Sequence, residues 1–341
     1  MTLRPISRRL LLTGTAASVA AAGVSRIPAS ARQDATPAAD VPLDQQLAQL
    51  LDSCNSIFGV VLIAPGDSPI YSLNRDVPFI SASLYKLVLL AETLARVEAG
   101  ELALDQTVEI QPEFYILANG DDSYFTPDAI GYEAMIEELA YSAGAYSSNV
   151  GAQALISLTE RNLLEQFAAG LGMNQTRYWV EGSAIREMYG KVAGRPPSLD
   201  YVRSLAFLES FAGYGAVNLT SPGDMATFFR LLRDNQLVSP VVSWQIRHIL
   251  EARVINDRIP ALLPQGTQVI HKTGNLDGVL HDAGIVQTAN GPVIAVTMAQ
   301  AATDYEMTIQ IEQRLGLLAY QVGAHQSESD GGGQVSWPAD W

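Results

Sequence analysis

Two apolar strand patterns near the end of the chain, separated by a short turn, constrain the fold most strongly. The patterns HDAGIVQTA (281–289) and PVIAVTMAQ (292–300) flank Asn290-Gly291, a pair typical of the type I′ turn in tight β-hairpins. A third strand pattern, TQVIHKTG (267–274), comes just before them. These three segments predict neighbouring strands of one antiparallel sheet.

Further strand patterns occur at the other end of the chain, in IFGVVLIA (57–64) and IYSLN (70–74), which a PGDS turn joins. Apolar residues at helical spacing predict one helix before these strands, at 43–51, and a closing helix at 303–322. The region from about 100 to 250 also favours helices. The order predicts an α/β (α+β) fold in which helices flank an antiparallel five-stranded sheet and an all-helical subdomain is inserted. We expect a site in the cleft between the sheet and the helices.

The first 31 residues have the features of an export signal rather than of a folded element. Arg8-Arg9 precedes an apolar run over 10–24, and the small residues at 29–31 offer a cleavage site. We therefore expect a Tat-type signal peptide over 1–31 and a periplasmic or extracellular protein. No later stretch approaches the roughly 20 apolar residues of a membrane span, so we expect no stable span after cleavage.

Composition indicates a globular domain over 43–322, because 48% of the residues are hydrophobic and 17% are charged. The segment 32–42 is a Pro/Ala-rich linker, and the polar, glycine-rich end at 323–341 is expected to be disordered. A formal net charge of −15 argues against nucleic acid as a partner, and we expect a monomer with a small-molecule substrate. Cys54 is the only cysteine, which excludes an intrachain disulfide.

A rare lysine marks the first group of polar residues that can carry chemistry. The chain has only three lysines, and Lys86 follows Ser83 by three residues at the start of an apolar helical run. Residues at this spacing share one helix face, and a desolvated ammonium has a lowered pKa and can accept a serine proton. The alternative is that Ser83 caps the helix and Lys86 lies on a solvated face.

Two further groups of polar residues lie at a helix start and at the end of a strand. Ser147 and Asn149 precede a helical pattern, where a hydroxyl can relay a proton and an amide can hold a substrate. Lys272-Thr273-Gly274 ends a strand pattern, where the two side chains can bind a carboxylate and glycine permits close approach. Taken singly, a helix cap and an ordinary strand end explain these residues equally well.

Together, the three groups correspond in order to the S-x-x-K, S-D-N and K-T-G motifs of one enzyme family. The chain resembles the class A β-lactamase-like and penicillin-binding-protein-like serine hydrolases over roughly 43–322, including a Thr-x-Pro segment in 219–232. The resemblance implies a β-lactamase/transpeptidase-like fold, no cofactor and no metal. It also implies a small-molecule substrate, either a β-lactam or a peptidoglycan-type peptide.

The resemblance implies an acyl-transfer role for four side chains. Ser83 would attack a carbonyl and form an acyl-enzyme, while Lys86 would help to take its proton. Ser147 and Lys272 would pass a proton to the leaving nitrogen.

The resemblance implies a substrate-binding role for three further residues. Asn149 would hold a substrate amide, and Thr273 would help to bind a carboxylate. The backbone N–H of Ser83, with one from the strand just after Gly274, would form an oxyanion hole.

The chain departs from the class A pattern in ways that affect the release of the acyl group. Ser148 stands where class A enzymes usually carry aspartate, and Asn218 stands where the family has an acid that clamps the Ω-loop. That loop normally supplies a glutamate that activates water, with Leu-Asn beginning three residues later. Here Glu181 and Glu187 are candidates for this base, but neither is followed by Leu-Asn at that spacing.

The first expectation for the reaction is therefore β-lactam hydrolysis by an exported serine hydrolase. The alternatives are a D-Ala-D-Ala peptidase or another amide or ester hydrolase, and a non-catalytic penicilloylated binding module. His271, His281 and Asp282 are possible zinc ligands, but their places at strand ends explain them equally well, and we expect no metal site.

Overall fold

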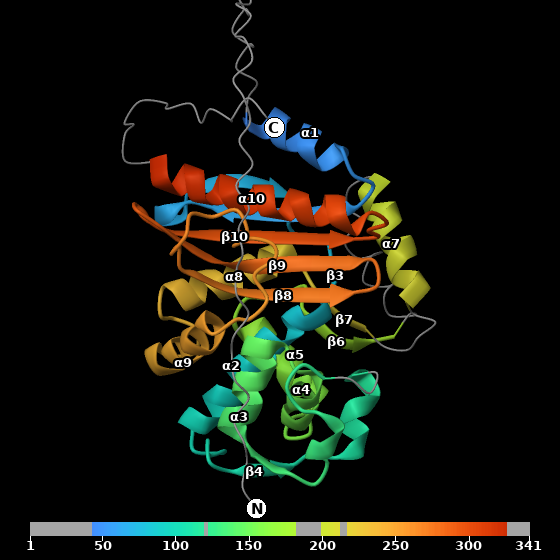
Figure 1. Ribbon diagram of the computed structural model, residues 1–341, viewed down its shortest axis with the longest axis vertical. Helices are drawn as coiled ribbons and strands as arrows, with labels where there is room; N and C mark the ends of the chain where they lie inside the picture. The colour runs from blue at the N-terminus through green and yellow to red at the C-terminus, as the bar shows by residue number, and fades with distance from the viewer. Residues whose placement is uncertain (1–42, 119–121, 182–198, 212–216, 326–341) are drawn as a thin grey trace, which may run out of the picture. The chain divides into compact units, whose positions relative to one another are not determined.

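A five-stranded antiparallel sheet forms the centre of the fold (Figure 1). The computed structural model describes residues 43–118, 122–181, 199–211 and 217–325. The strand order is β2-β1-β10-β9-β8, so both ends of the chain contribute to one sheet, and the predicted five-stranded antiparallel sheet is confirmed. The strands are β1 (Ile57–Ile63), β2 (Pro69–Leu73), β8 (Val269–Leu276), β9 (Val279–Thr288) and β10 (Gly291–Gln300).

The hairpin between β9 and β10 is confirmed, but its predicted type I′ turn is wrong. Thr288 pairs with Gly291, which leaves Ala289 and Asn290 as the loop, and neither has the positive φ that a type I′ turn requires. Gly291 alone takes a positive φ, of 122°. The Asn290 side chain instead donates hydrogen bonds to the carbonyls of Gly323 and Ala324, so it caps the helix that closes the fold.

One face of the sheet is covered by helices from the two ends of the domain. Helices α1 (Leu43–Asp52) and α10 (Tyr305–His325) share an apolar cluster with alternate side chains of β1, namely Phe58, Val60 and Leu62. The closing helix was predicted to end at 322, but it continues to 325, so the predicted disordered tail is wrong over its first three residues.

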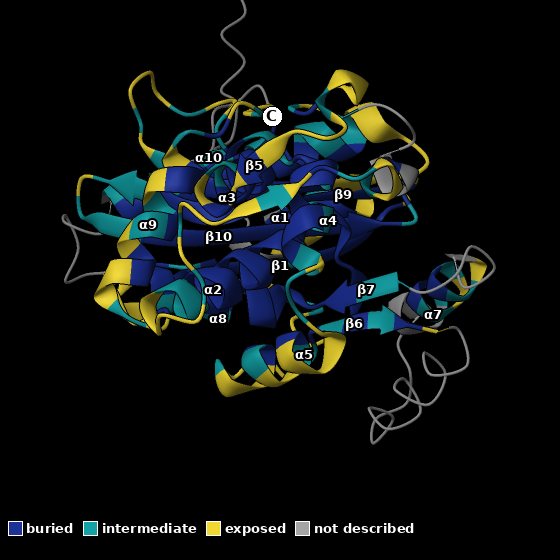
Figure 2. Cartoon of the chain, turned by 90° about the horizontal axis from the view of Figure 1, so that it is seen from below, coloured by how far each residue is buried: buried dark blue, intermediate teal, exposed yellow. Residues whose placement is uncertain are grey.

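The opposite face of the sheet packs on the helices that lead into the site (Figure 2). Ile57 and Val61 of β1 point to this side, where they join a cluster with α2 (Tyr85–Glu98) and α8 (Pro222–Arg233). Because β1 is buried on both faces, its sequence is a continuous apolar run rather than an alternating one.

The region from about 100 to 250 is mainly helical, but it is not all-helical as predicted. Its described helices include α3 (Ile136–Tyr141), α4 (Asn149–Ile156), α5 (Arg161–Gly170), α7 (Leu199–Phe211) and α9 (Pro240–Glu251). Strands β4 (Thr107–Glu109) and β5 (Glu133–Met135) pair there, while β6 (Arg177–Val180) and β7 (Val217–Thr220) form a second small sheet with β3 (Phe79–Ile80). Strands this short show too few residues for an alternating pattern to be recognised.

The predicted signal peptide (1–31) and linker (32–42) lie outside the described residues, as do Glu187 and residues 326–341 of the predicted tail. Among the helices that the structure describes, none combines the length and the hydropathy needed to cross a membrane.

The spacing of β8 and β9 can be tested with matched glycine substitutions. A Cβ added to Gly284 of β9 would lie 2.5 Å from the carbonyl oxygen of Ile270, so Gly284→Ala must displace backbone and should destabilise the fold by about 1–3 kcal/mol. Gly170→Ala is the control, because its added methyl meets nothing within 4 Å and should be neutral or slightly stabilising. Urea unfolding of both variants measures this difference, and equal midpoints would contradict the described strand spacing.

Candidate active site

Ser83 lies in a tight turn that connects β3 to helix α2. A 3₁₀ turn over Ala82–Leu84 precedes the helix, and no side chain caps either element, so the alternative in which Ser83 is a helix cap is wrong. Ser83 is half-buried and lines a cavity of about 250 Å³. The turn is thus the part of the chain that presents a hydroxyl to this cavity.

A buried histidine fixes the strand that leads into this turn. His281 Nε2 lies 2.7 Å from the carbonyl oxygen of Ile80, and Nδ1 lies 2.5 Å from the carbonyl oxygen of Leu280 and 3.1 Å from the nitrogen of Ala299. Burial lowers the pKa of His281 to about 4, so the ring is neutral at physiological pH. His281 therefore ties β9 to β3 from within the core and does not line the cavity.

Lys86 is completely buried in the first turn of α2, so the alternative of a solvated lysine is wrong. Its Nζ donates to the carbonyl of Ser147 (2.5 Å) and to Asn149 Oδ1 (2.7 Å). The expected hydrogen bond with the Ser83 hydroxyl is not among the contacts of the described residues. Burial lowers the pKa of Lys86 to about 7, with Asp122 acting to raise it and Arg253 to lower it further.

Ser147 connects Lys86 to the second buried lysine. A π-helical turn (Ser142–Tyr146) ends at Ser147, which has left-handed backbone angles (φ 63°, ψ 25°). Its carbonyl faces Lys86, and its Oγ accepts a hydrogen bond of 2.8 Å from Lys272 Nζ. Burial and the charges of Arg253 and Lys86 hold the pKa of Lys272 well below its ordinary value.

Ser148, which follows, caps helix α4 through its Oγ, and this oxygen accepts the N–H of Gly151. The same hydroxyl donates to Asp122 Oδ1 (2.8 Å), and Asp122 Oδ2 accepts the N–H of Asn149 (2.7 Å). Asp122 belongs to a separate loop before this turn, and sequence reasoning missed it. A single aspartate outside any recognised motif carried no signal in the sequence.

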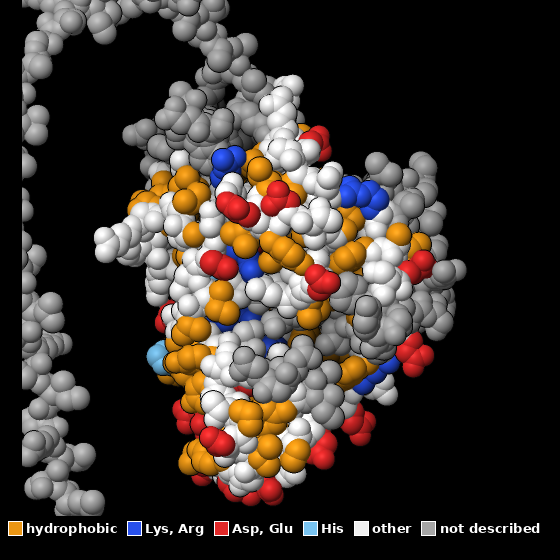
Figure 3. All heavy atoms as spheres, turned by 45° about the vertical axis from the view of Figure 1, so that its right-hand side comes forward, with side chains coloured by type: hydrophobic (Ala, Val, Ile, Leu, Met, Phe, Trp, Pro, Cys, Tyr) orange, Lys and Arg blue, Asp and Glu red, His pale blue; other side chains and the backbone are white. Residues whose placement is uncertain are grey.

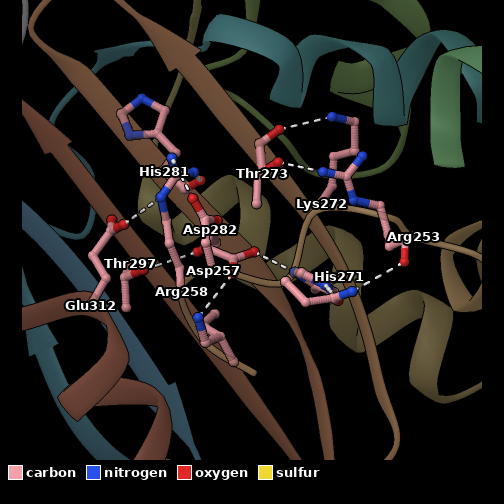
Figure 4. Close-up of polar contacts among 12 residues, drawn as sticks. Arg253, Asp257, Arg258, His271, Lys272, Thr273, His281, Asp282, Thr297 and Glu312 are labelled. Atoms are coloured by element: carbon pink, nitrogen blue, oxygen red, sulfur yellow. Dashed lines mark hydrogen bonds and ion pairs between the residues drawn. The ribbon is translucent and has the colours of Figure 1, made fainter. Parts of the chain in front are cut away.

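Arg253 is the second residue of the site that sequence reasoning missed. Its guanidinium is buried, donating to the carbonyls of Gly144 (3.2 Å) and Ala145 (3.0 Å) and to the hydroxyl of Thr273 (Figure 4). Burial lowers its pKa to about 10, which keeps it charged at neutral pH. Arg253 therefore joins the π-helical turn before Ser147 to strand β8.

Gly274 lies against the turn that carries Ser83. A Cβ at this position would lie 3.2 Å from the carbonyl oxygen of Ser81 and 3.3 Å from the backbone nitrogen of Ser83. Strand β8 thus runs against the Ser83 turn, which brings Thr273 and Asn275 to the lining of the same cavity.

The acids proposed to activate water are not brought to Ser83 by any contact of the described residues. Glu181 directly follows β6 with an exposed side chain, and Glu187 lies outside the described residues. Asn218 Oδ1 accepts the N–H of Trp179 (2.9 Å), so the amide still ties β6 to β7. The role of Glu181 stays a prediction.

The histidine and aspartate considered as metal ligands form a buried hydrogen-bond network instead (Figure 4). His271 Nδ1 contacts Asp282 Oδ1 (2.8 Å), and its Nε2 contacts Asn256 Oδ1 (2.9 Å). The other oxygen of Asp282 accepts the N–H of Ile259. In the described part of the chain, no group of three or more such side chains is arranged to hold a metal ion.

The electrostatic character of the cavity differs from that of the whole chain. The residues that line the cavity are Ser83, Asp122, Ser123, Tyr146, Ser147, Asn149, Ile255, Thr273 and Asn275. Three buried basic side chains, Lys86, Lys272 and Arg253, contact this lining through Ser147, Asn149 and Thr273. The face of the molecule in Figure 3 displays acidic and basic side chains distributed among hydrophobic ones, and the whole chain has a formal net charge of −15. The site therefore favours a ligand that carries negative charge.

Comparisons with known proteins agree with this geometry. Residues 42–322 match the sequence model of the Beta-lactamase enzyme family. A solved β-lactamase from Sphaerobacter thermophilus is 22% identical, with a TM-score of 0.64 over 81% of this chain and 94% of that one. A point mutant of PBP-A, solved as an acyl-enzyme complex with penicillin G, is 19% identical, with a TM-score of 0.65 over 83% of this chain and 97% of that one.

A curated relative has a regulatory name. The β-lactamase regulatory protein BlaB of Streptomyces cacaoi is 24% identical over 256 residues, which cover 66% of this chain and 78% of that protein.

The fold is thus the β-lactamase/transpeptidase-like fold of serine hydrolases and penicillin-binding proteins. The chain belongs to the beta-lactamase enzyme family.

The lowered pKa of Lys86 predicts a pH-dependent stability. Between pH 7 and the ordinary value of 10.5, the unfolded chain binds a proton that the folded chain has released, so folding becomes more favourable as pH rises. Lys86→Met removes this contribution, and its free energy of unfolding relative to wild type should be highest at pH 7 and below and fall toward pH 10. Urea unfolding at pH 6, 8 and 9.5 measures the trend, whereas a constant difference would show that the pKa of Lys86 is not lowered.

Proposed function

We propose that this protein is an acylating serine hydrolase whose Ser83 opens β-lactam rings. The observation that carries the proposal is the chain of contacts from Lys86 through Ser147 to Lys272 beside a cavity that Ser83 lines. Membership of the beta-lactamase enzyme family and the likeness in fold to PBP-A support the same chemistry.

Lys86 is suited to take the proton of Ser83. A neutral lysine amine has two hydrogens and one lone pair, and the two hydrogens are used by the Ser147 carbonyl and Asn149 Oδ1. The lone pair is then free to accept a proton as Ser83 Oγ bonds to the carbonyl carbon. With a pKa of about 7, a large fraction of Lys86 is neutral near physiological pH.

Ser147 is suited to return a proton to the leaving nitrogen. Its Oγ accepts from Lys272 (2.8 Å), so its own hydrogen can be donated into the cavity. As the carbon–nitrogen bond of the lactam breaks, this hydrogen passes to the nitrogen, and Lys272 can replace it. Together the two steps form the Ser83 ester and a new N–H bond, and they leave the Ser83 proton on Lys86 and Lys272 one proton short, so atoms and charge balance.

The substrate should carry a carboxylate near the group that is attacked. Arg253 is buried and positive, and its guanidinium donates to the hydroxyl of Thr273, which lines the cavity. Lys272 Nζ donates to the carbonyl of the same residue. Asn149, which also lines the cavity, would bind the amide of the substrate through its side chain. This arrangement supports the expected roles of Thr273 and Asn149, and β-lactams with a ring carboxylate satisfy both.

The geometry supports acylation more strongly than release. Of the described residues that line the cavity, Asp122 is the only acid, and its oxygens are occupied by backbone N–H groups and Ser148. Glu181 is exposed. This favours slow turnover, either as a weak β-lactamase or as a penicillin-binding enzyme that also cleaves D-Ala-D-Ala peptides.

A second candidate function is a β-lactam sensor that stays acylated. Two observations favour it: none of the described acids is placed to activate water beside Ser83, and the relative BlaB is named a β-lactamase regulatory protein. The lifetime of the acyl-enzyme separates the two functions.

Intact mass spectrometry after mixing with benzylpenicillin tests the proposal. Wild type should gain the whole mass of the drug, because the leaving nitrogen remains attached through the opened ring, and Ser83→Ala should gain nothing. Labelling of Ser83→Ala would remove Ser83 as the nucleophile, and an unlabelled wild type would refute the proposed function.

The same experiment, followed over time, measures release. Recovery of the free mass within minutes indicates hydrolysis, and an adduct that lasts for hours indicates a sensor or a penicillin-binding enzyme. If Glu181 activates water, Glu181→Gln should prolong the adduct relative to wild type. An unchanged lifetime would remove Glu181 from this role.

We also propose that residues 1–31 direct export through the twin-arginine route to the periplasm or the medium. Arg8→Lys together with Arg9→Lys should retain the protein inside the cell, since this route requires the arginine pair. Cell fractionation followed by N-terminal sequencing measures both location and cleavage. Export that is unaffected by the double substitution would contradict the proposal.

A further inference from the structure

The carboxylate of Asp122 accepts five hydrogen bonds. Its Oδ1 accepts the N–H groups of Tyr124 and Phe125, both at 3.0 Å, and the hydroxyl of Ser148 at 2.8 Å. Its Oδ2 accepts the N–H groups of Asn149 at 2.7 Å and of Val150 at 3.1 Å. The carboxylate therefore joins its own loop to the first turn of helix α4.

The balance of these contacts keeps Asp122 ionised. Burial raises the pKa of its carboxyl, but the hydrogen bonds from Phe125, Val150 and Ser148 outweigh burial, and the pKa lies below the ordinary value. A negative charge is thus held at the start of α4, where the unpaired N–H groups of a helix favour it.

The acid and the hydroxyl have exchanged places relative to the class A motif. That motif carries its aspartate between the serine and the asparagine, a position that Ser148 occupies here. In this structure the hydroxyl of Ser148 donates to a carboxylate that comes from the preceding loop. The turn between Ser147 and Asn149 therefore still contains an ionised acid, supplied by a different segment.

We propose that Asp122 is a positioning residue for the Ser83 reaction, because it fixes the turn from Ser147 to Asn149. The carbonyl of Ser147 and the side-chain oxygen of Asn149 in this turn accept the hydrogen bonds of Lys86. The inference deepens the proposed function and depends on it for its kinetic consequences. Its structural part does not depend on it: Asn149 donates its backbone N–H to Asp122 and accepts Lys86 on its side chain. A shift of this turn would move both partners of Lys86 together.

The charges around Lys86 give the proposal a measurable signature. Asp122 acts to raise the pKa of Lys86, and Arg253 acts to lower it. Lys272 lies on the other side of Ser147, to whose hydroxyl it donates. Tyr85 is a further titratable neighbour, with its ring centroid 5.8 Å from Nζ. Removing the charge of Asp122 leaves Lys86 facing other cations, so its proton should be released at lower pH.

The titration of Lys86 can be observed directly because the chain has only three lysines. In protein labelled with ¹³C-lysine, the Cε signal that is missing from Lys86→Met identifies Lys86. Asp122→Asn should move the midpoint of this signal to lower pH, while Ser148→Ala, which keeps the carboxylate, should leave it nearly unchanged. An unchanged midpoint in folded Asp122→Asn would overturn the inference, whether or not the protein reacts with penicillin.

The acylation rate gives the second measurement. The second-order rate constant for a fluorescent penicillin at pH 7 should fall at least about tenfold in Asp122→Asn, since displacement of a catalytic group by about 1 Å costs up to 100-fold. The rising limb of the plot of this rate constant against pH should move to lower pH by the same amount as the midpoint of the Lys86 titration. A slower rate with an unshifted limb would indicate general loss of structure and contradict the proposed role.

A double substitution tests whether a carboxylate at position 148 can replace the carboxylate of Asp122. Asp122→Ser combined with Ser148→Asp returns the carboxylate to the motif position and should recover at least about tenfold of the rate lost in Asp122→Ser. Failure to recover would show that a carboxylate from position 148 does not replace Asp122. If wild type is never acylated, the proposed function fails, and the lysine titration alone decides the inference.

Discussion

The site depends on burying two ammonium groups that contact the same serine. A buried lysine is costly unless its hydrogens are bonded, and Lys86 and Lys272 meet this condition only where the Ser83 helix, the Ser147 turn and strand β8 come together. Three segments far apart in sequence are therefore fixed by one requirement. Burial, with Arg253 adding to it, lowers the pKa of both groups, so the same constraint that orders the fold also favours the neutral form of these lysines.

The supporting residues follow from this constraint. Arg253 is bound by the carbonyls of the π-helical turn and by Thr273, and it fixes the distance between that turn and β8. His281 holds the strand before Ser83 from the opposite side. Because these groups are packed into the core, a small movement of either would displace Ser83 or Ser147 relative to the lysines.

The sheet could be predicted from its strand patterns, and the motif residues and their grouping from the resemblance to the family, because each motif is contiguous in sequence. Asp122 and Arg253 were missed for a physical reason, since their roles arise from contacts with segments 26 and 20 residues away and leave no local pattern. Ser148 illustrates the limit. Its departure from the motif was visible, but its partner could be recognised only once the loop and helix α4 were placed together.

The exchange between Ser148 and Asp122 bears on how such a site can change its reaction. In the proposed reaction, acylation uses Ser83, the lysines and an acid that holds the Ser147 turn, and that acid comes from the loop of Asp122. Release would need an acid with free oxygens beside the acyl group, whereas Asp122, the only acid among the described residues that line the cavity, is already bonded. The proposal therefore assigns acylation and release to separate residues, so that one step can change without the other.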